Sequence, residues 1–246
     1  MPWKNTALWT GLLAVLLVAA PCWAAEQEIV WSQTDGLRYE IYHSATAAGE
    51  WEQPEKLTDN NANNLHPAFV IAPNGSRWIF WSAVRPDGIS IQYLVGRDGN
   101  WSEPMTMEME GLTSAIAPSV LLDQQGTIWM VWAGNDGSSQ DEIYWSRHKG
   151  SAWQKPQMLN AANQVPDIRP EISRNEQGQL EVRWQGFRDD KYKDLASVWD
   201  GTAWSAEQEF KKEEEPEKEA PVLPEFVPQG SQYVLLDAPA GQEGGK

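Results

Sequence analysis

Charged and amide side chains of this sequence gather in a few short segments that could bind a ligand. The candidates are His66, Arg85, Asn135, Asp136, Asp167, Arg169, Arg188 and Asp189. His66 and Arg169 stand directly before a proline at matching places of an internal repeat, where the other two copies have Ala117 and Leu223. The repeat itself does not require a charged group there, so these two are the leading candidates. An ion pair between Arg169 and Asp167 is an equally good use of the charge.

The residue types also argue against several kinds of chemistry. The three histidines, His43, His66 and His148, are not at metal-ligand spacing, and we expect no metal and no cofactor. The oxygen-rich run at 135–142 could hold calcium, but it lacks the EF-hand order and is better interpreted as an acidic turn. A formal net charge of −16 at pH 7 makes nucleic acid an unfavourable partner.

A repeat of about 50 residues positions these segments. Four tryptophans with spacings of 50, 52 and 51 residues each follow a turn: Trp51, Trp101, Trp153 and Trp204. Four prolines each begin a strand, a glycine turn and a second strand, as in a β-hairpin: Pro67, Pro118, Pro170 and Pro224. A third strand is expected at 89–94, 142–146 and 196–199, and 40–44 repeats its pattern. Four short antiparallel strands per repeat are typical of a propeller blade.

Each end of the chain carries only part of a repeat. The N-terminal part supplies a third and a fourth strand over 40–57, preceded by a short fragment at 29–32, and the C-terminal part supplies a first and a second strand over 225–237. Joining the two parts completes a blade and removes exposed sheet edges. The sequence therefore predicts an all-β, four-bladed β-propeller whose last blade is closed by N- and C-terminal strands. The alternative is that the acidic stretch at 211–221 begins a disordered tail.

The start of the chain resembles an export signal. Residues 1–24 have the charged start, apolar run and small-residue site of a signal peptide, with cleavage after Ala24, so the protein is expected in the periplasm or outside the cell. Acylation of Cys22 in a lipoprotein is less favoured, because Pro21 precedes it. Residues 25–210 then form the propeller, 211–221 an acidic flexible connector, 222–238 the closing hairpin and 239–246 a disordered tail. No apolar run in the mature chain is long enough to span a membrane.

Three strings resemble the repeats of sialidase-like BNR-repeat propellers: Gly-Thr-Ile-Trp-Met-Val-Trp (126–132), Asp-Glu-Ile-Tyr-Trp-Ser-Arg (141–147) and Gly-Ser-Ala-Trp-Gln-Lys-Pro (150–156). The resemblance implies the propeller architecture over nearly the whole mature chain. True sialidases use three arginines, a Tyr–Glu nucleophile pair and a further acid. Here the family's Asp-box, Ser-x-Asp-x-Gly-x-x-Trp, is degenerate in every repeat. Arg169 in Ile-Arg-Pro matches only loosely, and no motif supports Arg85 or Arg188 as its companions.

Three functions remain open. The favoured one is a noncatalytic binding module for a protein or glycan, using the face where the loop entering the first strand and the loop joining the second and third strands meet. The alternatives are a sialidase-like glycoside hydrolase and a structural or assembly component of the bacterial envelope acting through the connector. A monomer and a hairpin-swapped dimer are both compatible with the sequence. Tryptophans in repeat slots are expected in the core, whereas Trp31, Trp145 and Trp199 are freer to face a ligand.

Overall fold

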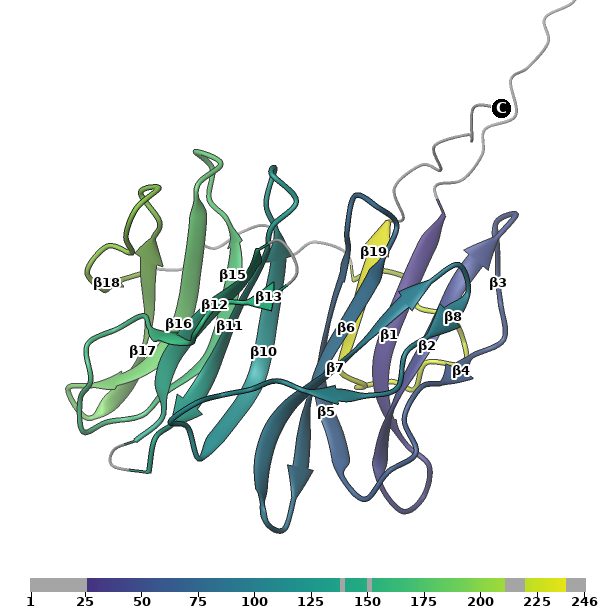
Figure 1. Cartoon of the computed structure of the whole chain (residues 1–246), viewed down its shortest axis with the longest axis horizontal. Helices are drawn as coiled ribbons and strands as arrows, with labels where there is room; N and C mark the ends of the chain where they lie inside the picture. The colour runs from purple at the N-terminus through teal and green to yellow at the C-terminus, as the bar shows by residue number, and fades with distance from the viewer. Residues whose placement is uncertain (1–25, 138–139, 150–151, 211–219, 238–246) are drawn as a thin grey trace, which may run out of the picture.

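The computed structural model describes residues 26–137, 140–149, 152–210 and 220–237. This part of the chain is all-β, with strands β1 to β19 and no helix (Figure 1). The expected signal peptide, the tail at 239–246 and most of the acidic connector lie outside the described residues.

The strands form three sheets, and the ten-stranded one consists of two antiparallel groups joined by a single parallel bridge between Ser114 and Ile89. We therefore describe four antiparallel units, numbered along the chain. Unit one contains β19 (Tyr233–Asp237), β1 (Gln27–Thr34), β2 (Tyr39–Ala47), β3 (Glu50–Trp51) and β4 (Glu55–Lys56). Unit two contains β5 (Asn63–Ile71), β6 (Arg77–Arg85), β7 (Gly88–Arg97), β8 (Asn100–Trp101) and β9 (Met105–Thr106). Unit three contains β10 (Ser114–Leu122), β11 (Ile128–Asn135), β12 (Glu142–Lys149), β13 (Ala152–Trp153) and β14 (Gln157–Met158). Unit four contains β15 (Asp167–Arg174), β16 (Leu180–Arg188), β17 (Lys191–Val198) and β18 (Gln208–Glu209).

The first strands of units two, three and four share a β-bulge. The residue before the proline has a positive φ in each: 53° at His66, 55° at Ala117 and 55° at Arg169. The pairing register shifts at the same places, between Leu65 and Ala68 in unit two, for example. A proline has no N–H to donate to the ladder, and a bulge accommodates it inside a strand.

The two ends of the chain meet in unit one, as predicted. Strand β19 pairs antiparallel with β1, so that Trp31 lies opposite Tyr233 and Gln27 opposite Asp237. The division of strands differs from the prediction, because residues 29–32 belong to a full strand and β1 lies between β19 and β2. The hairpin expected at 222–238 is instead a single strand preceded by turns. Pro224 and Pro228 cannot donate ladder hydrogen bonds, and their carbonyls accept turn bonds from Val227 and Ser231.

Three apolar clusters join neighbouring units. Val30 of unit one clusters with Ile79 of unit two, Phe80 of unit two with Met130 of unit three, and Val131 of unit three with Val182 of unit four. The freedom expected for two tryptophans is not found: Trp31 and Trp145 are both buried. Neighbouring strands and units cover both indoles, whereas Trp199 is half-buried.

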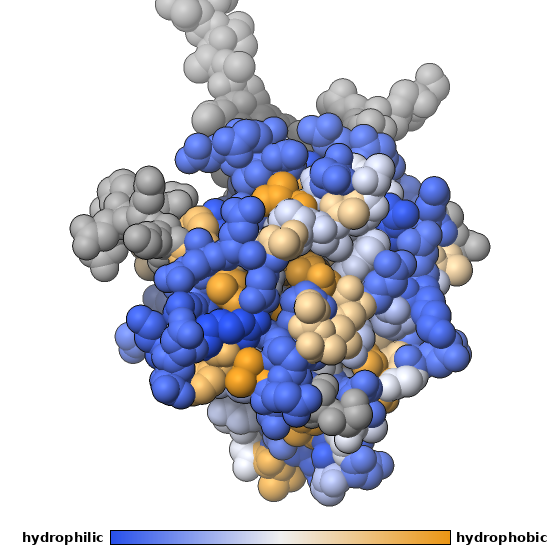
Figure 2. Space-filling view, turned by 90° about the vertical axis from the view of Figure 1, so that its left-hand side faces the viewer, coloured by the Kyte–Doolittle hydropathy of each residue, from blue (hydrophilic) through white to orange (hydrophobic). Residues whose placement is uncertain are grey.

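The expected ring closure is not made by the described residues, and the units form an open arc whose first and fourth units lie at opposite ends in Figure 1. The outer side of unit one is covered by Phe226 and Val227, which pack on Trp31. The outer side of unit four carries Glu181 and Arg183, and Figure 2 shows that end of the molecule with hydrophilic residues surrounding a smaller group of apolar ones. A covered apolar side and a polar side both end a repeat array without a further unit.

Candidate functional site

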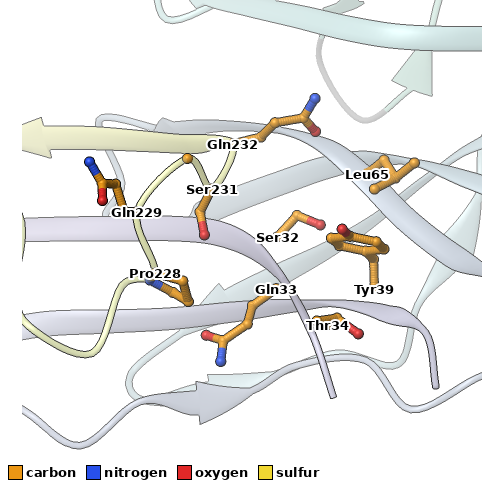
Figure 3. Close-up of a pocket in the computed structure, with 10 residues that line it drawn as sticks. Ser32, Gln33, Thr34, Tyr39, Leu65, Pro228, Gln229, Ser231 and Gln232 are labelled. Carbon is orange, nitrogen blue, oxygen red and sulfur yellow. The ribbon is translucent and has the colours of Figure 1, made fainter. Parts of the chain in front are cut away.

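A hollow of about 320 Å³ opens beside unit one, where the C-terminal segment meets β1 and β2 (Figure 3). We call it the Gln232 hollow; it is lined by Ser32, Gln33, Thr34, Tyr39, Leu65, Pro228, Gln229, Gly230, Ser231 and Gln232. The lining residues carry hydroxyl and amide groups, one phenol ring and no charged side chain. The volume lies at the small end of the range of ligand pockets.

Part of this lining is fixed by hydrogen bonds and part is free. The Ser32 hydroxyl donates to the carbonyl of Asn64 (2.6 Å), and the Gln232 side-chain oxygen accepts from the backbone N–H of His66 (2.9 Å). The side chains of Gln229 and Ser231 make no hydrogen bond within the described part of the chain. Tyr39 is 45% exposed. One side of the hollow is therefore fixed by hydrogen bonds, while unpaired polar groups and an aromatic ring remain available to a ligand.

The two leading sequence candidates lie near one another at the bulges of β5 and β15. Burial lowers the pKa of His66 below the usual histidine range, and the positive charge of Arg169 lowers it further. His66 Nδ1 lies 3.2 Å from the hydroxyl of Ser82, whereas Arg169 makes one long hydrogen bond, 3.5 Å, to Gln185. His66 adjoins the Gln232 hollow through its backbone, and Arg169 lines a separate hollow of unit four.

The other sequence candidates are dispersed. Arg85 lines a hollow of about 440 Å³ between units two and three, which we call the Arg85 hollow. Asn135 closes its own turn, accepting a 2.6 Å hydrogen bond from the N–H of Gly137, and Asp136 follows it in the same loop. Asp189 is an exposed turn residue paired with Lys193 (2.7 Å), whose hydrogen bond and positive charge lower the pKa of Asp189.

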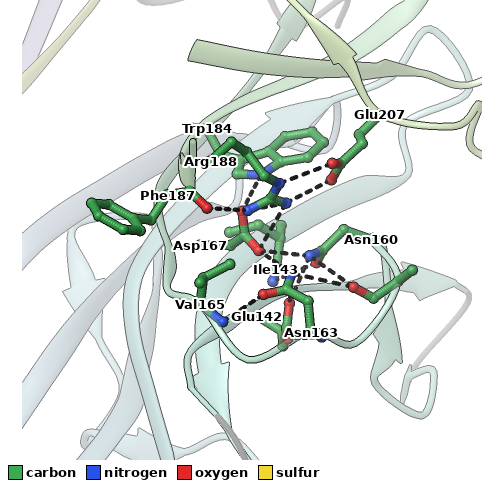
Figure 4. A network of polar contacts seen from close by, with 11 residues as sticks. Glu142, Ile143, Asn160, Asn163, Val165, Asp167, Trp184, Phe187, Arg188 and Glu207 are labelled. Carbon is green, nitrogen blue, oxygen red and sulfur yellow. Dashed lines mark hydrogen bonds and ion pairs between the residues drawn. The ribbon is translucent and has the colours of Figure 1, made fainter. Parts of the chain in front are cut away.

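Asp167 and Arg188 belong to a buried network between units three and four (Figure 4). The Asp167 carboxylate accepts from the Trp184 indole (2.9 Å) and from Asn160 (2.9 Å), and Arg188 lies 3.2 Å away. Asn160 also donates to the carboxyl group of Glu142 (2.6 Å). The expected ion pair between Arg169 and Asp167 is not formed, because Arg188 takes this place. The three arginines considered for a sialidase-like site do not line a common hollow among those described.

Glu142 and Asp167 are the acid pair most like a catalytic one. Burial raises the pKa of Glu142 above the usual glutamate range, and the neighbouring Asp167 adds to the rise. A raised carboxyl pKa beside a second acid is a feature of glycosidase sites. However, Glu142 is 1% and Asp167 0% exposed, so neither can flank a glycosidic bond. The pair therefore connects two units.

The same arrangement recurs between units one and two, without the second acid. Asn64 takes the place of Asp167: it accepts from the Trp81 indole (2.8 Å) and donates to Glu40 (2.9 Å). In the matching slot between units two and three stands Ala115, and the indole N–H of the buried Trp132 has no hydrogen-bond partner. The Arg85 hollow lies at this junction and includes Ala115.

Three acids gather near the β1–β2 loop: Asp35, Glu40 and Asp59. Their oxygen atoms lie within 4.8 Å of one another, which is compatible with a cation site. Lys56 already provides the positive charge, with its Nζ 3.0 Å from Asp35 and 3.1 Å from Asp59. Backbone N–H groups of Arg38 and Leu37 lower the pKa of Asp35, and Lys56 adds to this. We therefore interpret the group as an ion-pair cluster.

No protein-family model matches the sequence, and no curated protein matches it. Solved structures do match. A protein of unknown function from Dyadobacter fermentans DSM 18053 has a TM-score of 0.59 at 12% identity, covering 75% of this chain and 65% of that one. An endo-arabinase from Bacteroides thetaiotaomicron VPI-5482 has a TM-score of 0.52 at 16% identity, covering 74% and 75%. An α-L-arabinanase from Penicillium chrysogenum, complexed with arabinobiose, has 0.53 at 11%, covering 70% and 58%.

The described part of the chain thus has an all-β fold like that of these solved structures, and the chain covers 65% of the Dyadobacter protein. Two of these solved structures are arabinanases, so the likeness supports the fold that the sequence resemblance implies but does not point specifically to sialidases. At these identities it concerns the fold alone. The described residues include no helix suited to crossing a bilayer.

The sequence interpretation missed the Gln232 hollow, although a signal was present. Ile29-Val-Trp-Ser32 repeats Ile79-Phe-Trp-Ser82, the middle of the second strand of unit two. Aligning 29–32 with 79–82 makes 29–32 part of the second strand of unit one. Thr34 and Tyr39 then lie at the end of unit one that corresponds to the end of unit two where Arg85 lies. That is the face on which a site was expected.

Proposed function

We propose that the protein is a noncatalytic binding module that holds a neutral glycan in the Gln232 hollow. The observation that carries the proposal is the composition of this hollow: hydroxyls and amides around one exposed tyrosine, without a carboxylate. Sugar hydroxyls both donate and accept, as do the side chains of Ser231 and Gln229. The ring of Tyr39 supplies an apolar face. The arabinobiose named with the Penicillium structure makes arabino-oligosaccharides the first ligands to try.

The chemistry of the site favours binding over cleavage. Glycoside hydrolysis normally needs two carboxyl groups on either side of the bond, and the lining of the hollow supplies none. A protein partner is less favoured, because specific protein interfaces bury about 1,200–2,000 Å² and this hollow is small and concave. We further propose that the units are four blades of an open propeller, and that the chain is exported with cleavage after Ala24. The envelope-assembly alternative rests on a connector mostly outside the described residues.

Calorimetric titration with arabinobiose and a set of other neutral oligosaccharides tests the proposal. We expect Tyr39→Ala to weaken binding at least about tenfold, since the aromatic contact is lost. Tyr192→Ala is the matched control, because Tyr192 is 50% exposed in unit four, away from the hollow. Incubation with arabinan should release no reducing ends. Equal binding by both variants would contradict the site, and release of reducing ends would contradict the noncatalytic role.

A further inference from the structure

A hollow larger than the Gln232 hollow lies elsewhere, between the outer strands of units two and three. It measures about 540 Å³, and we call it the Trp153 groove. Four aromatic side chains line it: Trp78 and Tyr93 of unit two stack 5.8 Å apart, His148 and Trp153 of unit three lie 5.5 Å apart, and His148 contacts Trp78 with ring centroids 4.9 Å apart. An aromatic lining of this kind offers flat apolar surface to a ligand.

The matching junction of units three and four carries larger rings. There Trp204 lies 6.1 Å from Trp129 and 5.4 Å from Trp199. His148 stands where unit four has Trp199, since they occupy the same place opposite Trp153 and Trp204. His148 keeps the ring contact with Trp78 (4.9 Å) that Trp199 makes with Trp129 (5.2 Å), but its imidazole is smaller than an indole, and the hollow lies beside it.

The groove also contains unused hydrogen-bonding capacity. In unit two, the Trp101 indole donates to Glu55 of the preceding unit (3.0 Å). Met105 occupies the corresponding position next to Trp153, and its thioether is only a weak hydrogen-bond acceptor. The indole N–H of Trp153 is buried without a hydrogen-bond partner. Leaving such a donor unpaired is costly. The ring instead packs on Phe80 and His148, with centroids 5.6 and 5.5 Å away, and a ligand that brings an acceptor must shift one of these contacts to reach the buried N–H.

The groove also contains acids. Glu108 and Glu110 line it, and Glu110 pairs with Lys155 across 3.1 Å, both exposed. A ligand that suits the whole groove needs apolar faces, an acceptor for an indole N–H and donors for carboxylates. A proline-rich peptide meets the first two needs but has few donors, because proline lacks an N–H. A sugar ring meets all three.

We propose that the Trp153 groove is a second saccharide site, separate from the Gln232 hollow. The ligand class rests on the proposed function, while the site rests on its own geometry. Two sites on one rigid chain bind a long glycan more tightly than either site alone.

The test is a ¹H–¹⁵N correlation spectrum of the labelled protein, titrated separately with arabinobiose, cellobiose and a proline-rich peptide. Trp153→Phe identifies the indole signal of Trp153 by its loss. We expect a sugar to shift this signal. The signal of Trp204, which occupies the same repeat slot and is also unpartnered, should stay in place.

Affinity at the groove, followed by the Trp153 signal, should fall at least about fivefold in Glu108→Gln, because a bond to a charged acceptor is lost. Glu103→Gln, an exposed acid outside the lining, is the control. A Trp153 signal unmoved by either sugar overturns the proposal, and so does a shift caused by the peptide alone. If Trp153 shifts while Tyr39→Ala leaves all sugar binding unchanged, the groove stands and the function proposed for the Gln232 hollow fails; the reverse result refutes the groove alone.

Discussion

The contacts between units give a prediction with a definite size, centred on Asn64. This side chain is fully buried, accepts from the Trp81 indole and donates to Glu40. Asn64→Ala leaves a buried indole N–H without an acceptor, which costs about 1–3 kcal/mol, and removes a hydrogen bond to a carboxylate, which costs about 1.5–3 kcal/mol. We expect a loss of about 3–5 kcal/mol, a large part of the total stability of an ordinary domain.

The reverse change is available in the next unit. Ala115→Asn places an amide in the slot in front of Trp132, whose N–H has no partner. Leu112 lies close to that N–H and also lines the Arg85 hollow, so it has space to move aside. We expect a gain of about 1 kcal/mol.

Equilibrium unfolding in urea, followed by tryptophan fluorescence, measures both changes. Asn100→Ala is the control, because Asn100 is exposed and should change stability by no more than about 0.5 kcal/mol. A loss below about 1 kcal/mol for Asn64→Ala would refute the reasoning that these polar clusters hold the units together. The slopes against urea must agree among variants for the comparison to hold.

Three further changes test other parts of the structure. Burial would raise the pKa of Glu28, but hydrogen bonds from His43 and Arg77 lower it below the usual value. The stability that ionised Glu28 contributes is therefore present above about pH 4.3 and is lost as the pH falls. In a pH series of melting curves, Glu28→Gln should lose less stability on acidification than the parent protein does. Gly96→Ala puts a Cβ 2.5 Å from the Trp101 ring, so we expect about 1–3 kcal/mol of destabilisation by urea unfolding, and an unchanged value would contradict the packing. Phe226→Ala uncovers Trp31, and light scattering should detect self-association that the parent protein lacks.

Much of the fold could be predicted because the repeat fixes local chemistry. The prolines and glycine turns predicted the hairpins β5–β6, β10–β11 and β15–β16, and the third strand expected at 89–94 lies within β7. Ring closure was harder, because it depends on which side of a strand faces a neighbour. Glu181 and Arg183 occupy slots that hold Trp78 and Phe80 in unit two, and this exchange of aromatic for charged residues was the available signal of an outer face.

The candidate site was less predictable from the residues. Asp167 was expected on an open rim, but it lies three residues before a proline, at the start of β15, and it accepts from the indole of Trp184. Nothing local to the sequence distinguishes a loop acid from one enclosed by the next unit. The Gln232 hollow depends on 228–232 crossing β1, which follows from the pairing of β19 and not from any motif.

The most direct test of the proposed function is a crystal structure of the protein with arabinobiose or the best-binding neutral oligosaccharide. The proposal predicts an intact sugar in the Gln232 hollow, with one ring against Tyr39 and hydroxyls bonded to Ser231 or Gln229. A sugar absent from this hollow, or one found cleaved, would contradict it.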